Sequence, residues 1–226
     1  MFNKFKELFS SENLLDIAFN TTLTMLDFDY KMYDASRGSL RESDNAELPF
    51  DVRKMDKKIN KFEREVRRNV LTHLTIAGTQ NLVPGLALVS IVIDVERIGD
   101  YTKNIAGLAK IHPARLQGGK HESTLKSIED KIEENFTAVI DVLKTQDTGQ
   151  ARAILLAEEQ MGKKSDAIVE DLVVATNKTI TTKDAVSLAM YARYLKRINA
   201  HLTNIASSIV NPFPRIGFRE KKKTSK

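Results

Sequence analysis

The chain has 226 residues, with 35 basic and 30 acidic side chains, a formal net charge of +5 at pH 7, and no cysteine. The absence of cysteine excludes disulfides, thiolate metal sites and cysteine nucleophiles. Most of the excess positive charge lies in residues 219–226, so the body is nearly neutral and lacks the basic face expected of a nucleic-acid binder. No signal-peptide pattern is present. The longest apolar run, Leu86 to Val95, is too short to span a bilayer, so we expect a soluble, cytoplasmic protein.

Apolar residues recur at three- to four-residue spacing in three segments of the first half, which predicts three helices. Asn13 is expected to cap the first helix, which ends near Gly38. The second begins near Pro49, and the third runs from about Pro84 to Lys110, after a turn at 77–81. The stripes predicted to face the core are Leu14, Ile17, Thr21, Leu23 or Thr24, Phe28, Met32 and Ala35 in the first helix, and Met55, Ile59, Phe62, Val66 and Val70 in the second.

The second half predicts three more helices after a linker at Gly118 and Gly119. Asp147 and Gln150 resemble a capping box for the fifth helix, and Thr181 or Thr182 is expected to cap the sixth, which ends near Val210. The apolar stripes are Leu125, Ile128, Ile132, Phe136, Val139 and Leu143 in the fourth helix, and Ile154, Met161, Ile168 and Leu172 in the fifth. No segment alternates with period two, so the sequence predicts an all-α fold. Residues 211–226 are expected to form a basic, disordered tail.

The two halves repeat one another. Arg97-Ile98 matches Arg197-Ile198, and Asn104-Ile105-Ala106 matches Asn204-Ile205-Ala206, both at an offset of one hundred residues. The second and fifth helices match at an offset of 106, which places Met55 on Met161. We therefore expect two tandem antiparallel three-helix bundles, residues 1–115 and 116–210, related by a pseudo-two-fold axis.

The segment from Asp94 to Ala106, DVERIGDYTKNIA, closely resembles the signature helix of the PhoU family of phosphate-uptake regulators. The segments Asp56–Glu63 and Tyr194–Ala206 resemble the helix before it and its second copy. The resemblance implies a non-enzymatic regulatory adaptor in phosphate transport and starvation signalling. Its implied partners are the cytoplasmic components of a phosphate transporter, on the ATPase side, and a sensor histidine kinase. The resemblance also allows a homodimer and at most peripheral contact with a membrane.

The family's Glu/Asp-x-x-x-Asp motifs can hold metal, and Glu96 and Asp100 match one such motif. Asp56 matches the start of another, in which Asn60 replaces the second carboxylate. The candidate ligands are Glu96, Asp100, Asp56, Asn60 and Glu63, whose oxygens favour iron, manganese, magnesium or calcium over zinc. In the second repeat Lys196 and Ala200 replace the acids, Gly162 stands where another would help, and Asp166 survives, so metal is expected mainly in the first repeat.

Each of these residues also has a structural interpretation. Glu96 and Asp100 could instead pair with Arg64, Arg67, Arg97 or Lys103. Arg97 and Arg197 are expected to pack between helices, Gly99 to allow a close helix approach, and Asn104 and Asn204 to make interhelical hydrogen bonds. No Glu-x-x-His, HExxH or phosphate-binding loop occurs, so we expect no enzymatic activity. The alternatives to the adaptor are an accessory subunit of another phosphate or anion carrier and a metal-free structural interaction bundle.

Overall fold

The structure is a computed structural model that describes residues 11–174 and 180–220. Over these residues the chain is helical and contains no strand. The long helices are α2 (Ser11–Arg41), α3 (Val52–Ala77), α4 (Leu82–Ile111), α5 (Glu122–Thr145), α6 (Thr148–Val174) and α7 (Thr182–Val210). Short 3-10 turns are η1 (Gly78–Asn81), η2 (Gly119–His121) and η3 (Phe213–Arg215). The predicted all-α fold is confirmed.

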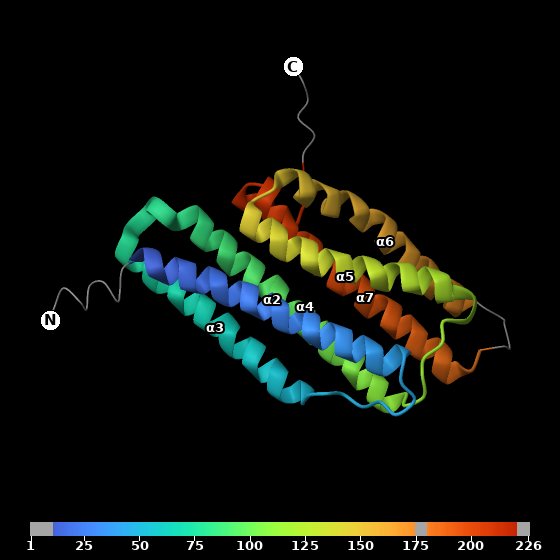
Figure 1. Ribbon diagram of the computed structural model, residues 1–226. Coiled ribbons are helices and arrows are strands. Elements are labelled where there is room, and N and C mark those ends of the chain that lie inside the picture. Colours follow the sequence, from blue (N-terminus) through green and yellow to red (C-terminus); the bar gives the residue numbers. More distant parts are fainter. Residues whose placement is uncertain (1–10, 175–179, 221–226) are drawn as a thin grey trace, which may run out of the picture.

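The helices form two antiparallel bundles that lie side by side (Figure 1). Helices α2, α3 and α4 pack against one another, as do α5, α6 and α7, and α4 contacts α7 along the line where the bundles meet. The buried side chains of both bundles form one connected hydrophobic core. The predicted tandem three-helix arrangement is therefore confirmed, whereas the limits 1–115 and 116–210 stay predictions.

Side-chain caps set where the helices begin. The Asp51 carboxylate accepts hydrogen bonds from the backbone of Arg53 and Lys54 and thereby starts α3. Asp147 does the same for α6 through Gly149 N at 2.8 Å and Gln150 N at 3.1 Å. The Thr181 hydroxyl accepts from Asp184 N and caps α7, as predicted.

The predicted core stripes of the second, fourth and fifth helices are confirmed, because their members are buried or pack against the core. The stripe predicted for the first helix is right only in part: Met32 is buried and Leu23 packs against the core. Ile17 is 39% exposed and Thr24 is exposed, and Asn13 lies inside α2 rather than at its cap. The buried face of α2 includes several polar side chains, so a search for apolar residues at helical spacing does not find it. Its members are Ala18, Thr22, Met25, Leu26, Asp29, Met32, Tyr33, Ser36, Ser39 and Leu40.

The start of the expected disordered tail is folded. The Asn211 side chain donates to the Phe218 carbonyl, and Gly217 N donates to the Ser207 hydroxyl at 2.7 Å. Glu220 pairs with Arg152 of α6. The expectation of disorder from residue 211 therefore fails for residues 211–220, and residues 221–226 lie outside the described part.

One helical stretch of the described chain, Val52–Ile111, is long and apolar enough by composition to cross a membrane. Its most apolar 18-residue window has a mean hydropathy of 1.7, and only 22% of that window is buried. The stretch is not one straight rod, because η1 turns the chain back so that α3 and α4 form a hairpin (Figure 1).

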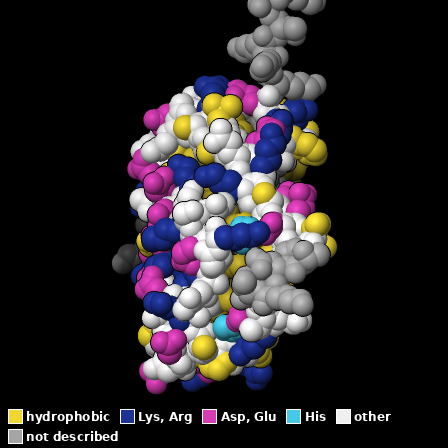
Figure 2. Space-filling view, turned by 90° about the vertical axis from the view of Figure 1, so that its right-hand side faces the viewer, with side chains coloured by type: hydrophobic (Ala, Val, Ile, Leu, Met, Phe, Trp, Pro, Cys, Tyr) yellow, Lys and Arg dark blue, Asp and Glu magenta, His cyan; other side chains and the backbone are white. Residues whose placement is uncertain are grey.

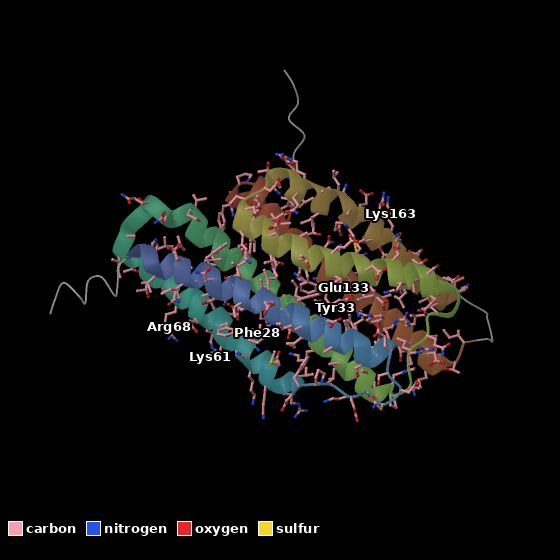
Figure 3. The ribbon with its side chains drawn as sticks, viewed as in Figure 1. Phe28, Tyr33, Lys61, Arg68, Glu133 and Lys163 are labelled. Carbon is pink, nitrogen blue, oxygen red and sulfur yellow. The ribbon has the colours of Figure 1, made fainter. Side chains whose placement is uncertain are left out.

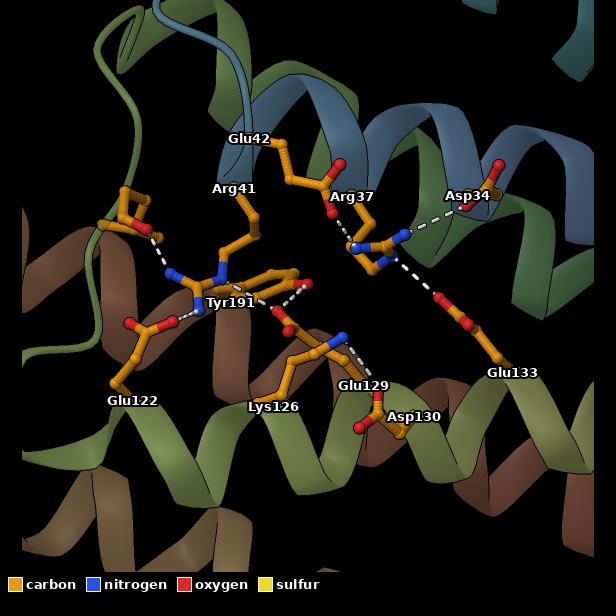
Figure 4. A network of polar contacts seen from close by, with 11 residues as sticks. Asp34, Arg37, Arg41, Glu42, Glu122, Lys126, Glu129, Asp130, Glu133 and Tyr191 are labelled. Carbon is orange, nitrogen blue, oxygen red and sulfur yellow. Dashed lines mark hydrogen bonds and ion pairs between the residues drawn. The ribbon is translucent and has the colours of Figure 1, made fainter.

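A polar network between α2 and the second bundle ties the two repeats together (Figure 4). The buried Arg41 guanidinium donates to Glu129 at 2.8 Å, to Glu122 and to the Leu116 carbonyl. Tyr191 of α7 donates to the same Glu129 carboxylate at 2.8 Å. Burial lowers the pKa of Arg41, but the facing carboxylates outweigh it and raise the pKa above its usual value.

Arg37, one turn earlier on α2, extends this network. It pairs with Glu133 of α5 at 3.0 Å and with Asp34 and Glu42 of its own repeat. Two arginines on one face of α2 thus hold α5 in register, as Figure 4 shows.

Candidate functional site: an acidic cluster in the first repeat

Four carboxyl groups of the first bundle are connected through Asp100 of α4: Glu96 lies one turn before it on α4, Lys103 links it to Asp56 of α3, and its charge acts on Asp29 of α2. We call this group the acidic cluster. Glu96 and Asp100 share one side of α4 because they are four residues apart. Lys103 Nζ donates to Asp56 Oδ1 and to Asp100 Oδ1, both at 2.7 Å, and so links α3 to α4.

Arg97 adds a second cation at the rim of the cluster. Its guanidinium lies 3.2 Å from Asp100 Oδ2 and 3.6 Å from Glu96 Oε2. Of the ion pairs considered from the sequence, those with Arg97 and Lys103 are the ones that the structure forms. The negative charge of the acidic cluster is therefore partly neutralised by Arg97 and Lys103, which both lie on α4.

Asp29, which the sequence analysis did not single out, is the most deeply buried member. Its side chain has no exposed surface, and neither carboxyl oxygen has a hydrogen-bond partner in the described structure. Burial, followed by the nearby Glu96 and Asp100, raises the pKa of Asp29 well above its ordinary value. The carboxyl therefore favours its neutral, protonated form.

Glu96 is shifted in the same direction. Burial and the adjacent Asp100 raise its pKa, and Glu63 adds to the effect against the opposing Arg97. Burial is the larger cause for both carboxyl groups, and the negative charge of the neighbouring acids adds to it.

Of the five predicted ligands, Asp56 and Asp100 share Lys103, and Glu96 and Asp100 share Arg97. Glu63 instead pairs with Arg67 on its own helix at 2.8 Å, and Asn60 makes no side-chain hydrogen bond within the described residues. In that part of the chain, no three His, Asp or Glu side chains stand close enough together to hold one metal ion. The predicted metal site therefore stays a prediction, and in this arrangement Lys103 occupies the space between two of its carboxylates.

The second repeat replaces the cluster by a single ion-paired acid. Lys196 Nζ lies 2.6 Å from Asp166 Oδ2, and Arg193 lies 3.4 Å from the other carboxyl oxygen. A Cβ placed on Gly162 would meet the Lys196 side chain at 3.7 Å, so the lysine passes over the glycine. The structure thus places a fixed positive charge in the second repeat where Glu96 stands in the first.

The two bundles have different side chains at the equivalent buried positions near their centres. In the second, the buried Asn135 donates to Asn199 at 2.7 Å. In the first, the matching positions are Asp29 and Gly99, and a Cβ on Gly99 would lie 2.9 Å from Asp29 Oδ1 and 3.0 Å from Ile59 Cδ1. The predicted close helix approach at Gly99 is therefore confirmed.

The signature helices of the two repeats meet at the contact between α4 and α7. Asp94 accepts from His201 at 2.7 Å and from Asn204 at 3.0 Å, which confirms the interhelical role predicted for Asn204. Tyr101 packs on Tyr194 with ring centroids 6.2 Å apart. The two contacts are equivalent in the repeat: at the offset of one hundred residues, Asp94 corresponds to Tyr194 and His201 corresponds to Tyr101. Tyr101 also stacks on its own counterpart, His201, at 5.8 Å, as the pseudo-two-fold axis requires.

A cleft of about 500 Å³ lies at the linker between the repeats. Both histidines of this cleft pair with carboxylates: His112 Nε2 lies 2.7 Å from Asp184, and His121 Nε2 lies 2.8 Å from Asp171. These imidazoles tie the linker to α6 and α7.

Comparison with known proteins gives a consistent result. A family model described as the PhoU domain matches residues 22–109 and 125–209. The chain is 22% identical over 188 residues to a phosphate-specific transport system accessory protein PhoU homolog of Clostridium acetobutylicum, covering 80% of this chain and 83% of the relative. Its fold matches the crystal structure of PhoU from Pseudomonas aeruginosa with a TM-score of 0.78, 20% identity, and coverage of 88% and 96% of the two chains. It also matches the phosphate transport system regulatory protein PhoU from Streptococcus pneumoniae with a TM-score of 0.70, 17% identity, and coverage of 88% and 93%.

Proposed function

Because the chain belongs to the PhoU family, we propose that it is a cytoplasmic regulatory adaptor of phosphate transport and phosphate-starvation signalling that acts by binding and not by catalysis. The observation that carries the proposal is the match of the family model to both repeats. The printed descriptions of the relatives, an accessory protein and a regulatory protein of phosphate transport systems, support it.

The proposed partners are the ATPase side of a phosphate transporter and a sensor histidine kinase. A rigid helical surface suits this role, because one connected core and the Arg41 network hold the two bundles as one body. Binding to either partner would then present both repeats in a fixed relation.

The test is deletion of the gene, with measurement of phosphate uptake and of starvation-gene expression. We expect both to change and to be restored by the wild-type gene. Unchanged uptake and expression would overturn the proposal. Affinity purification of the tagged chain should recover a transporter ATPase and a kinase, and recovery of a secondary carrier in their place would favour the accessory-subunit alternative.

We also propose that the acidic cluster accepts a divalent or trivalent cation when Lys103 moves aside. The buried Asp29 without a hydrogen-bond partner supports this proposal, since it lies beside Glu96 and Asp100 and all three supply oxygen ligands. Such ligands suit magnesium, manganese or iron. The cation would be regulatory, because binding would free Lys103 from Asp56 and Asp100 and so alter the outer surface of α3 and α4.

A further inference from the structure

The turn between α3 and α4 forms an apolar end of the first bundle. No Asp, Glu, Lys or Arg occurs between Arg68 and Asp94, although 29% of the chain is charged. Four large apolar side chains at this turn are exposed: Leu71 by 69%, Ile76 by 58%, Leu82 by 40% and Val83 by 62%. We call these four residues the apolar tip.

Burial in the core does not explain the composition of this segment. The most apolar window of Val52–Ile111 is only 22% buried, whereas an apolar helix in a soluble protein normally faces the interior. The tip lies at the end of the α3–α4 hairpin, at the left of Figure 1. The opposite end of the molecule differs, because there Lys and Arg side chains mix with Asp and Glu around small apolar spots (Figure 2).

A line of basic side chains leads along α3 to the tip. Lys57, Lys61, Arg64 and Arg68 follow steps of four, three and four residues, which places them on one face of the helix. All four are exposed, and none pairs with a carboxylate that the structure describes. Figure 3 shows Lys61 and Arg68 on the side of α3 away from α5 and α6. We call these four residues the basic stripe.

The basic stripe and the apolar tip are continuous. Leu71 follows Arg68 by three residues and Ile76 follows it by eight, so the exposed face of α3 changes from cationic to apolar over its last turns. At the rise of an α-helix, Ile76 stands about 12 Å beyond Arg68 along the axis. Interfacial helices bury their apolar face roughly 5 to 10 Å into the boundary between headgroups and acyl chains. The spacing between Arg68 and Ile76 is comparable to this depth.

We propose that this end of the protein docks on an anionic membrane surface. The apolar tip enters the boundary between headgroups and acyl chains, and the basic stripe contacts the anionic headgroups. Stable membrane attachment needs two signals, such as an apolar anchor with a polybasic patch, and the hairpin presents both on one surface. The tip has no fixed charge with which to select a protein partner, which favours lipid. This attachment goes beyond the proposed adaptor function and does not depend on it.

Insertion of the tip can be measured with a fluorescent side chain, because the chain has no native tryptophan. Val83→Trp places the probe in the tip, and Leu156→Trp places it at an 80% exposed position of α6 as a control. With phosphatidylcholine vesicles that contain phosphatidylglycerol, we expect a blue shift and quenching by brominated lipid for Val83→Trp only. Pure phosphatidylcholine vesicles should give a weaker signal, because the basic stripe then has no anionic partner.

The two signals can be separated by vesicle sedimentation. Leu82→Asn/Val83→Asn should weaken binding roughly tenfold or more, whereas Leu156→Asn/Val186→Asn, a matched exposed pair, should not. Arg64→Gln/Arg68→Gln should also weaken binding to anionic vesicles roughly tenfold or more, whereas Lys144→Gln/Lys183→Gln should not. Circular dichroism and thermal melting establish that each variant is folded.

Three results would overturn the proposal. One is vesicle binding without a spectral change in Val83→Trp, which would place the contact elsewhere. Another is a blue shift that grows with protein concentration in the absence of lipid, which would assign the tip to a second copy of the chain. The third is retention on native membranes but not on protein-free anionic vesicles, which would assign the tip to a membrane protein.

Discussion

At the scale of single residues, the two bundles solve one packing problem in two ways. In the first bundle Gly99 leaves space that Ile59 and Asp29 fill. In the second, Asn199 is larger, and Ser165 stands where the repeat places Ile59. In the second bundle the buried Asn135 and Asn199 side chains hydrogen-bond to one another. In the first bundle Gly99 has no side chain with which Asp29 could form such a bond, and both Asp29 carboxyl oxygens lack a partner. The unsatisfied carboxyl of Asp29 is therefore particular to the first repeat.

Asp29→Asn should change how stability depends on pH. The folded state raises the pKa of Asp29, so its protonation favours folding below about pH 4, and this contribution is lost as pH rises through the folded-state pKa. As the pH rises from about 4 towards the folded-state pKa, the free energy of unfolding of the wild type should therefore fall relative to that of Asp29→Asn, by up to about 1.4 kcal/mol per pH unit. Denaturant titrations at a series of pH values measure this difference.

The matched control for this experiment is Asp27→Asn, two residues away, where the carboxylate is exposed and pairs with Lys31 at the surface. Its pH profile should run parallel to that of the wild type. Parallel profiles for Asp29→Asn as well would mean that burial does not hold this carboxyl in its protonated form.

The proposed cation should bind the first repeat only. Metal content should fall to background in Glu96→Ala/Asp100→Ala and stay at the wild-type level in Asp166→Ala/Glu170→Ala, because Lys196 already neutralises the second site. Lys103→Met should bind more tightly than the wild type, since the ammonium between Asp56 and Asp100 is gone. Elemental analysis after dialysis against manganese or iron is the measurement, and equal metal in all four proteins would leave these acids as ion-pair partners alone.

At the scale of elements, two of the helix starts were predictable from a short polar side chain, whereas the Asp51 cap of α3 was not predicted and Asn13 does not cap α2. Thr181 and Asp147 stand at the helix starts expected from their chemistry. The core faces of α3, α5 and α6 were predictable for a similar reason, since their buried positions are apolar. The face of α2 was not, because Thr22, Asp29 and Ser36 lie on its buried line. A pattern that counts apolar residues cannot find a polar residue that is buried by its neighbours, and for this reason it also missed Asp29 as part of the site.

Thr181→Ala should lower the free energy of unfolding by about 1 kcal/mol, because α7 loses the side chain that satisfies Asp184 N. Thr182→Ala is the control, since Thr182 is exposed and is the first residue of the helix itself. Chemical denaturation compares the two, and equal effects would show that the cap contributes nothing to stability.

At the scale of the whole molecule, the Arg41 network determines how firmly the repeats are joined. The side chains of Arg41 and Glu129 are 5% and 2% exposed, so loss of Arg41 leaves the buried Glu129 carboxylate without a counterion, whereas loss of Glu129 leaves Arg41 paired with Glu122. The repeat predicted a pseudo-two-fold relation between the bundles, but it could not predict this contact, because Arg41 and Glu129 are 88 residues apart and no periodicity connects them. The repeat predicted that two bundles exist, and these contacts determine how they sit together.

Arg41→Met should reduce the free energy of unfolding by about 3 to 5 kcal/mol, as expected when one member of a buried pair is lost. Arg41→Met/Glu129→Leu should recover part of that loss, because no unpaired charge then remains buried: Glu122, which also loses Arg41, is 53% exposed, but the buried Tyr191 hydroxyl loses its acceptor. The control is Lys126→Met, whose ion pair with Asp130 is exposed and should matter little. A single variant as stable as the wild type, in thermal and chemical denaturation, would contradict a structural role for the network.

The self-matching contact between α4 and α7 bears on how such a chain can arise. Tyr101 stacks on His201, its own counterpart in the other repeat, so two identical one-repeat chains could meet through the same surface about a true two-fold axis. Gene duplication with fusion makes that encounter intramolecular, and its strength no longer depends on the concentration of the chain in the cell. Once fused, the halves need not stay alike. One copy can keep its carboxylates while the other exchanges them for Lys196 and Ala200, so that a symmetric pair of repeats becomes one asymmetric chain.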